Sequence, residues 1–276
     1  ATTVGSHRVL VEICAPHVAT VICQKPFAET IADAQAMVDH CLALGTNLII
    51  HENFRWQRAF QQMKEMVDAG KIGTPHFARF SFRHGYDNYV NQPYLAEIER
   101  FAIMDVGLHL FDLARHFMGD VALLSCTTQR LNCAVRGEDS FTALLQHDSG
   151  VTSICDCSFS SHYAPEPFPR TAALVEGDQG TLELDREFGI TLHRDGVREH
   201  SNAEPDVPIW GQKPWHTTQQ SVVSFQQHAA AVIHGKAQPQ PSGADNLQTL
   251  RLALAAYQSA ERGETIDMRS WREDRP

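Results

Sequence analysis

Hydrophobic residues in the first part of the chain fall into two kinds of pattern. Val18–Cys23 and Asn47–His51 are short apolar runs, which predict buried strands. Thr30–Leu44 repeats apolar residues with the period of a helix, and His7–Cys14 predicts a shorter helix. Apolar strands that alternate with helices are typical of a parallel sheet covered on both faces. We therefore expect residues 1–100 to form part of a doubly wound α/β domain.

From His76 onward the pattern changes to short strands separated by tight turns, which favour an antiparallel sheet. Two amphipathic helices, Thr217–His234 and Ala244–Glu261, follow the strands. We expect residues 101–276 to form an α+β domain with a large, mainly antiparallel open sheet, one face of which is covered by helices. The predicted strands are His76–Arg83, Leu123–Arg130, Phe141–Gln146, Val151–Phe159, Thr171–Glu176, Thr181–Asp185, Ile190–His193 and Val197–His200.

Composition limits the class of protein further. The chain has 276 residues, 43% of them hydrophobic. It contains neither a signal-peptide pattern nor an apolar run of roughly eighteen residues, so we expect a soluble, cytoplasmic protein that does not enter a membrane. The net charge is -10 and no basic cluster stands out, which argues against nucleic acid as a partner. Seven cysteines without zinc-type spacing fit a reducing compartment.

Candidate chemistry begins at the end of the first apolar strand. Gln24-Lys25-Pro26 places a lysine at the carboxyl end of a parallel strand, where open α/β sheets hold their ligands. Asp105 and His109 lie four residues apart in a segment with a helical pattern, so a helix would place both on one face. Together the three side chains predict a site that handles protons.

Both motifs resemble those of the Gfo/Idh/MocA family of nicotinamide-dependent oxidoreductases, the relatives of glucose-fructose oxidoreductase and inositol dehydrogenase. Members carry Glu-Lys-Pro after a strand of the nucleotide-binding domain and Asp-x-Gly-x-His-x-x-Asp on a helix. The second motif is present here as Asp105-Val-Gly107-Leu-His109-Leu-Phe-Asp112, whereas Gln24 replaces the usual glutamate. Because glutamine carries no charge, we expect it to lower the pKa of Lys25. The resemblance covers nearly all of the chain.

The resemblance implies hydride transfer between NAD or NADP and a hydroxyl of a sugar, inositol or related polyol. His109 is our candidate base for the hydroxyl proton, because an imidazole titrates near neutral pH. Asp105 is expected either to orient His109 or to bind a neighbouring hydroxyl. Lys25 is expected to stabilise developing alkoxide charge. These three residues are the catalytic candidates.

The glycine-rich loop that binds the cofactor's pyrophosphate in this family is missing. No Gly-x-Gly occurs in the sequence, and the first residues resemble the loop after the family's fourth strand. We therefore expect the chain to begin inside its Rossmann-like nucleotide-binding domain, so that this chain alone binds NAD weakly and is inactive. The cofactor-binding residues that the resemblance implies are Thr2, Thr3, His7, Gln24, Lys25 and Pro26.

The segment between the two motifs, Arg83–Tyr94, is too polar and aromatic for a core strand. In the family this region borders the pocket, and its polar groups suit a polyhydroxylated small molecule. The alternative is an ordinary surface loop with buried tyrosine rings. The stretch around Trp210 and Trp215 is expected to cover either the same pocket or an oligomer interface. The candidate substrate-binding residues are Arg55, Arg83, Tyr86, Gln92 and Tyr94, with a structural salt bridge as an equal alternative for Arg55.

Two other functions remain open. Asp105, His109, Asp112 and His116 recur along one helical stripe, a pattern that a metal-dependent hydrolase uses to bind a divalent ion. We favour no bound metal, because the apolar positions of the same helix make a good core face. The second alternative is a non-catalytic ligand-binding or regulatory member of the fold, which Gln24 and the missing loop favour.

The uncovered face of the predicted sheet is the natural surface for self-association. Family members pair through this face. We therefore expect a homo-dimer or tetramer with sheet packed on sheet.

Overall fold

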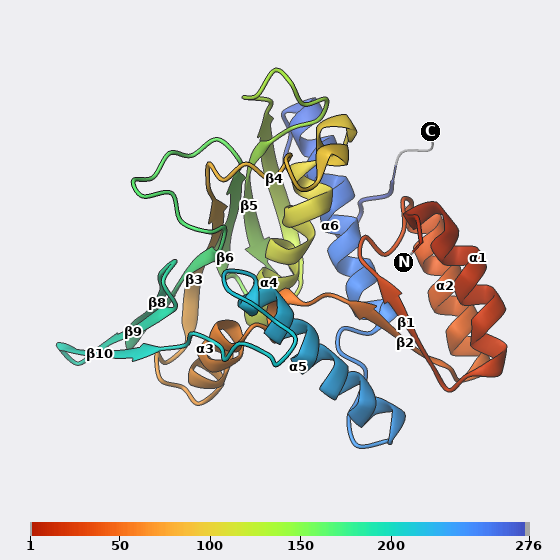
Figure 1. The fold of residues 1–276 in the computed structure, drawn as a ribbon, viewed down its shortest axis with the longest axis horizontal. Coiled ribbons are helices and arrows are strands. Elements are labelled where there is room, and N and C mark those ends of the chain that lie inside the picture. The colour runs from red at the N-terminus through yellow and green to blue at the C-terminus, as the bar shows by residue number, and fades with distance from the viewer. Residues whose placement is uncertain (1, 274–276) are drawn as a thin grey trace.

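The computed structural model describes residues 2–273, which form two sheets and the helices around them (Figure 1). The helices are α1 (His7–Cys14), α2 (Ile31–Leu44), α3 (Arg58–Asp68), α4 (Leu108–Met118), α5 (His216–Ile233) and α6 (Gly243–Arg262), and a π-helix, η5 (Ile103–Gly107), leads into α4. Short 3₁₀ turns lie at Val4–Ser6, Ala15–His17, Phe54–Trp56 and Pro93–Glu97. The strands are β1 (Thr20–Gln24), β2 (Asn47–His51), β3 (Pro75–Arg83), β4 (Val121–Gln129), β5 (Ser140–His147), β6 (Thr152–Ser158), β7 (Thr171–Gly177), β8 (Gly180–Leu184), β9 (Gly189–Arg194), β10 (Val197–Asn202) and β11 (Ile266–Asp267).

The smaller sheet pairs β1 with β2 in parallel, as their apolar sequences predict. Helix α2, which connects the two strands, begins where the Thr30 hydroxyl accepts a hydrogen bond from the Asp33 N–H. It ends at Gly45, whose φ of 69° closes the helix in the left-handed conformation. Both strands therefore run in the same direction, and their carboxyl ends point toward the larger sheet.

The larger sheet has nine strands in the order β10-β9-β8-β7-β3-β6-β5-β4-β11. Neighbouring strands are antiparallel except for β3 and β6, which run parallel across a long connection. The predicted class, a Rossmann-like part followed by a mainly antiparallel open sheet, is confirmed. The sequence pattern did not predict the two-residue strand β11, which is too short to carry a period.

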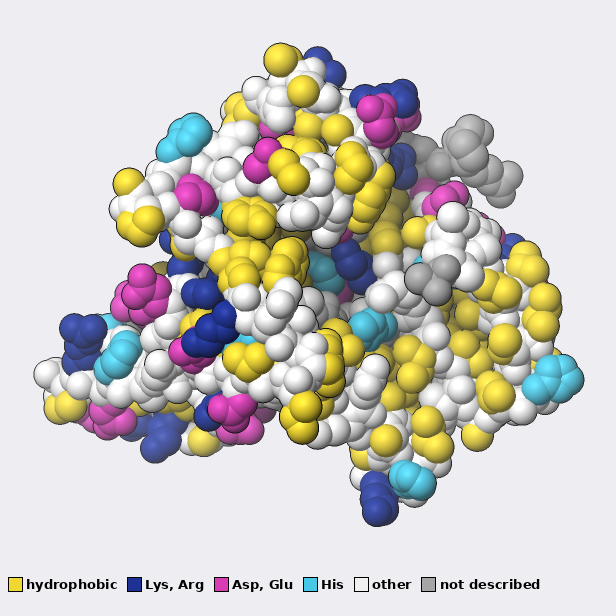
Figure 2. Space-filling view, in the orientation of Figure 1, with side chains coloured by type: hydrophobic (Ala, Val, Ile, Leu, Met, Phe, Trp, Pro, Cys, Tyr) yellow, Lys and Arg dark blue, Asp and Glu magenta, His cyan; other side chains and the backbone are white. Residues whose placement is uncertain are grey.

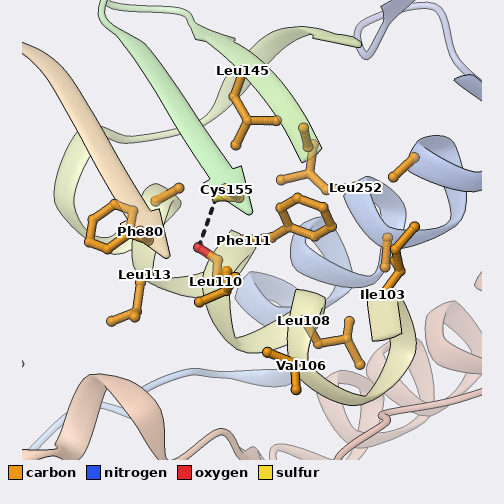
Figure 3. Packing of buried hydrophobic residues seen from close by; sticks show 14 of the residues in the cluster. Phe80, Ile103, Val106, Leu108, Leu110, Phe111, Leu113, Leu145, Cys155 and Leu252 are labelled. Atoms are coloured by element: carbon orange, nitrogen blue, oxygen red, sulfur yellow. Dashed lines mark hydrogen bonds between the residues drawn. The ribbon is translucent and has the colours of Figure 1, made fainter. Parts of the chain in front are cut away.

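The helix that carries the second motif is held in the core of the molecule. Leu110, Phe111 and Leu113 of α4 pack among buried side chains of the large sheet and of α6 (Figure 3). The Cys155 thiol of β6 donates to the Leu110 carbonyl at 3.4 Å. Because apolar contacts surround this helix, its polar side chains project from a rigid frame.

The face of the large sheet away from α4 and α6 is open. Along β5 every second side chain is exposed, namely Thr142, Leu144 and Gln146. Strand β3 precedes residue 100 and yet lies in the middle of this sheet. We therefore propose that the boundary between the two predicted domains, expected at residue 100, lies between β2 and β3. Within residues 2–273, none of the helices combines the length and hydropathy that crossing a bilayer requires.

Candidate functional site

Two adjoining cavities lie where the small sheet meets the large one. The larger has a volume of about 880 Å³, and Thr2, Thr3, Gln24, Lys25 and Pro26 line it. The smaller has a volume of about 190 Å³ and shares two lining residues, Asp105 and Thr218, with the larger. Figure 2 shows the resulting hollow, with basic and histidine side chains deep inside it. All the expected cofactor-binding residues except His7 therefore face one cavity.

Lys25 and Asp105 form an ion pair on the wall between the cavities. The lysine Nζ lies 2.9 Å from Asp105 Oδ1 and also donates to the Asp105 carbonyl at 2.9 Å. Burial favours the neutral amine, but the carboxylates of Asp105 and Glu52 outweigh burial and raise the pKa of Lys25. In return, Lys25 outweighs the effect of burial on Asp105 and lowers the pKa of that carboxyl. Both groups are therefore charged near neutral pH.

The replacement of glutamate by Gln24 does not leave Lys25 without a carboxylate. The net shift of the Lys25 pKa is upward from its ordinary value, because Asp105 supplies a negative charge beside it. That the pKa is lower than it would be beside a glutamate at position 24 stays a prediction. The Gln24 side chain instead accepts a hydrogen bond from the Lys25 backbone N–H at 2.9 Å.

His109 is held by a different carboxylate. Its Nδ1 is hydrogen-bonded to Glu52 Oε1, and its ring stacks on Phe54 with the ring centroids 3.9 Å apart. The expectation that Asp105 orients His109 is therefore corrected. Residues 103–107 form a π-helix, whose wider turn directs Asp105 toward Lys25 and away from the imidazole.

The polar stripe on this helix does not converge on one point. Asp112 binds Arg55 through both carboxylate oxygens, at 2.7 and 2.5 Å, while Asp105 and His109 have the separate partners described above. Burial and the nearby Glu52 carboxylate raise the pKa of Asp112 to about 6, against the opposing effect of Arg55. Among residues 2–273, no group of three or more His, Cys, Asp or Glu side chains is arranged to hold a metal ion.

Of the expected substrate-binding residues, two line the cavities and three do not. Tyr94 lines the larger cavity and Gln92 the smaller one. Arg55 is instead fully engaged with Asp112 and Asp245, so the salt-bridge alternative holds for it. Arg83 reaches Asp156 on the open face of the sheet, at 3.3 Å, because alternate residues of a strand point to opposite faces.

Tyr86 and His7 also lie outside the cavity walls. The Tyr86 ring packs edge-on against Phe168 with the centroids 5.5 Å apart. His7 is 6% exposed, and its Nδ1 lies 3.2 Å from the Phe27 carbonyl. Tyr86 therefore contacts a ring that lines the smaller cavity, while His7 is bonded to backbone.

Trp215 and Arg170 both line the smaller cavity. A place over the pocket was one of two expectations for the Trp215 stretch, whereas sequence reasoning missed Arg170. Nothing in the local pattern distinguished Arg170, which follows a proline-rich loop. Glu52 did not stand out as a site residue, because its partner His109 is 57 residues away in sequence and only folding brings the two together.

A lysine that follows a parallel strand and an imidazole in the adjoining cavity are groups that can move a proton at a substrate hydroxyl, as in oxidoreductases that use a nicotinamide. Residues 60–183 match the model of the GFO/IDH/MocA C-terminal domain. The chain belongs to this family.

Two curated relatives and one solved structure are similar along almost the whole chain. A D-apiose dehydrogenase from Paraburkholderia graminis is 47% identical over 277 residues, which cover 100% of this chain and 74% of that protein. A D-apiose dehydrogenase from Rhizobium rhizogenes is 46% identical, covering 97% of this chain and 78% of that protein. The crystal structure of an oxidoreductase from Agrobacterium radiobacter with NAD+, L-tartaric acid and magnesium is 45% identical, covers 98% of this chain and 79% of its own, and has a TM-score of 0.95.

These similarities bear on one expectation. The relatives are named dehydrogenases, so the reading of the chain as an enzyme is confirmed. The chain spans 74% and 78% of the lengths of the two curated relatives.

Proposed function

We propose that the chain catalyses NAD(P)-dependent oxidation of a hydroxyl of a small sugar, with D-apiose as the first substrate to test. The observation that carries the proposal is the Lys25–Asp105 ion pair. Lys25 Nζ lies 2.9 Å from Asp105 Oδ1, and Asp105 lines both the larger and the smaller cavity. The identity of 47% to a D-apiose dehydrogenase supports the choice of substrate.

The larger cavity suits a nicotinamide cofactor. Its volume of about 880 Å³ falls within the range of small-molecule sites, and hydroxyl and amide groups of Thr2, Thr3 and Gln24 line it beside the Lys25 ammonium. Donors of this kind match ribose and carboxamide groups. When bound, the cofactor would supply the hydride acceptor. The neighbour crystallised with NAD+ supports this assignment.

The side chains of the site have separate roles in the proposed reaction. The Lys25 ammonium donates to the substrate oxygen and stabilises negative charge as it develops there. His109 takes the hydroxyl proton on Nε2, the ring nitrogen that bonds to no described residue. Asp105 holds Lys25 in its charged form. Gln92 and Tyr94 are the proposed substrate contacts among the residues that the sequence singled out.

Replacement of Lys25 tests this function. Lys25→Met should lower kcat with D-apiose by about 10²- to 10³-fold, because it removes a charge that acts on the transition state. The melting temperature should change little, since Lys25 is partly exposed at a strand end. Lys71→Met, at an exposed turn, is the matched control. Turnover of the Lys25 variant within about threefold of the parent enzyme would remove Lys25 from the mechanism.

Three further features belong to the proposal. The open sheet face suits pairing of two copies into a homo-dimer or tetramer. The seven cysteines, all free thiols, support a location in the reducing cytoplasm. Neither nucleic acid nor a membrane is a proposed partner, because the net charge is -10.

A further inference from the structure

Glu52 lies directly after β2 and is fully buried, with 0% of its surface exposed. Its Oε1 accepts a hydrogen bond from the Phe54 backbone N–H at 3.2 Å and is also bonded to His109 Nδ1. The other oxygen, Oε2, is buried without a hydrogen-bond partner among residues 2–273. A buried carboxylate in this condition is costly to the fold, so a purely structural role does not account for it.

The charge state of Glu52 decides the tautomer of His109. The imidazole and the Phe54 N–H outweigh the effect of burial and lower the pKa of Glu52, so the group is a carboxylate. A carboxylate can only accept hydrogen bonds, and the proton in the contact therefore sits on His109 Nδ1. Whenever the ring gives up its second proton, the free lone pair is on Nε2, which is the form a general base requires.

We infer that Glu52 is the positioning residue for His109: it fixes the imidazole with Nε2 toward the small cavity and stabilises the imidazolium that forms when Nε2 takes the substrate proton. Phe54 holds the ring plane from one side, with an angle of only 2° between the two rings. The division of roles follows that of the carboxylate in a serine-protease triad. The inference rests on the proposed function, in which His109 is the base.

The other charges near the imidazole are already paired with one another. Lys25 binds Asp105 at 2.9 Å, and Arg55 binds Asp112 at 2.7 Å. Burial lowers the pKa of His51, so that ring is neutral near pH 7. Glu52 is therefore the single described charge that directly bonds the ring. The titratable groups that interact with His109 are Glu52, His51 and Asp105. Lys25, Arg55 and Asp112 interact in turn with Glu52.

Glu52→Gln tests the inference because it keeps the shape and removes the charge. We expect kcat to fall by about 10²-fold or more with KM within about threefold, by analogy with the loss of the orienting carboxylate in a triad. The acid limb of the pH–rate profile should move to lower pH, because an imidazolium without its anion loses its proton more readily. Glu52→Asp keeps the charge and should keep the acid limb near its original position.

Asp139→Asn is the matched control. Asp139 is another carboxylate with 0% exposure, but it binds the backbone N–H groups of Leu131 and Asn132 instead of an imidazole. This variant should lose stability while leaving the acid limb where it is. A shift of the same size in both variants would attribute the effect to a general loss of packing and overturn the inference.

A second measurement does not depend on turnover. Nitrogen NMR of the histidine rings should report His109 protonated on Nδ1 in the parent enzyme, and a mixture of tautomers in Glu52→Gln. In the His109→Asn background, Glu52→Gln should cost less than about threefold in kcat, because a residue that acts through His109 has nothing left to act on. The inference would be overturned if the two substitutions lower kcat by factors that multiply in the double variant. It would also be overturned if His109 keeps the same tautomer in Glu52→Gln.

Failure of the role inferred for Glu52 can be distinguished from failure of the proposed function. If His109→Asn retains its turnover, the proposed base is wrong and the proposed function loses its proton acceptor. If His109→Asn is impaired but Glu52→Gln is folded and as fast as the parent, only the role of Glu52 is overturned. If Glu52→Gln does not fold, the tautomer and acid limb of Glu52→Asp decide the matter.

Discussion

Lys25 and His109 are each bonded to one carboxylate. Lys25 is paired with Asp105 and His109 with Glu52, at residue separations of 80 and 57. The first pair keeps an ammonium charged at the cavity wall, whereas the second holds an imidazole in place through its Nδ1. A donor and an acceptor for the same hydroxyl are thus maintained by two separate carboxylates.

Asp105→Asn tests the first pair through pH. Lys25 has a raised pKa in the parent, so its charge is present up to high pH and is lost as the pH rises through that pKa. Removal of the carboxylate lowers the Lys25 pKa, and we expect the alkaline limb of the pH–rate profile to move to lower pH. The acid limb should move less than in Glu52→Gln, because Asp105 interacts with His109 through its charge alone and makes no hydrogen bond to the ring. Steady-state rates from about pH 5 to 10 measure both limbs. An alkaline limb that stays unchanged would show that Lys25 does not depend on Asp105.

At the scale of elements, an ion pair locks the end of β2 to α4. Arg55 follows β2 and has 5% of its side chain exposed, and Asp112 of α4 has 0%. Arg55 also reaches Asp245 near the start of α6, at 3.2 Å. The segment that carries Glu52 is therefore fixed to the helix that carries His109, which keeps the two in register.

Removing one partner of this buried pair should be costly. Arg55→Leu should lower the free energy of unfolding by about 3–5 kcal/mol, because it leaves Asp112 buried without a counter-charge. Arg55→Leu combined with Asp112→Leu should recover most of the loss, while Asp245 remains paired with Arg115 at 2.9 Å. Urea unfolding of both variants measures this. Arg8→Leu, at an exposed ion pair, serves as control and should be nearly neutral. A single variant as stable as the control would contradict the argument.

At the scale of the whole molecule, the open face of the large sheet is the feature that remains without a covering layer. Leu144 is 49% exposed and Leu123 37% exposed on this face, and polar residues such as Gln146 lie between them. A mixed apolar and polar sheet face of this size favours pairing about a two-fold axis, in which each Leu144 lies near its own copy.

Leu144→Asp should therefore convert the proposed dimer into a monomer, because it places two like charges at the centre of the contact. Light scattering at micromolar concentration measures the mass directly. Leu42→Asp is the matched control, since Leu42 is 77% exposed but lies on α2, away from the sheet. A parent protein that is already monomeric, or a Leu144 variant of unchanged mass, would contradict the proposed interface.

The periodic patterns of the sequence by themselves determined most of the elements, and two short motifs carried the resemblance to the family. The α2 cap at Thr30 and the strand at Asn47–His51 follow from local propensity and apolar period, which depend only on neighbouring residues. The motifs at Lys25 and at Asp105 also stand in short, contiguous segments. Patterns of this kind can be recognised in the sequence alone, because they do not depend on which residues distant in sequence come into contact in the core.

Only the tertiary structure decided which charges meet. A helical spacing of four residues paired Asp105 with His109, but the π-turn at Ile103–Gly107 separates them, and no period in the sequence marks such a turn. Arg55 and Arg83 were expected to bind a polyhydroxylated ligand. In the structure Arg55 is buried against Asp112, and Arg83 lies on the open face of the sheet, where it pairs with Asp156. Glu52 acquires its place beside His109 for the same reason: a buried charge takes whichever partner the packed core brings within reach.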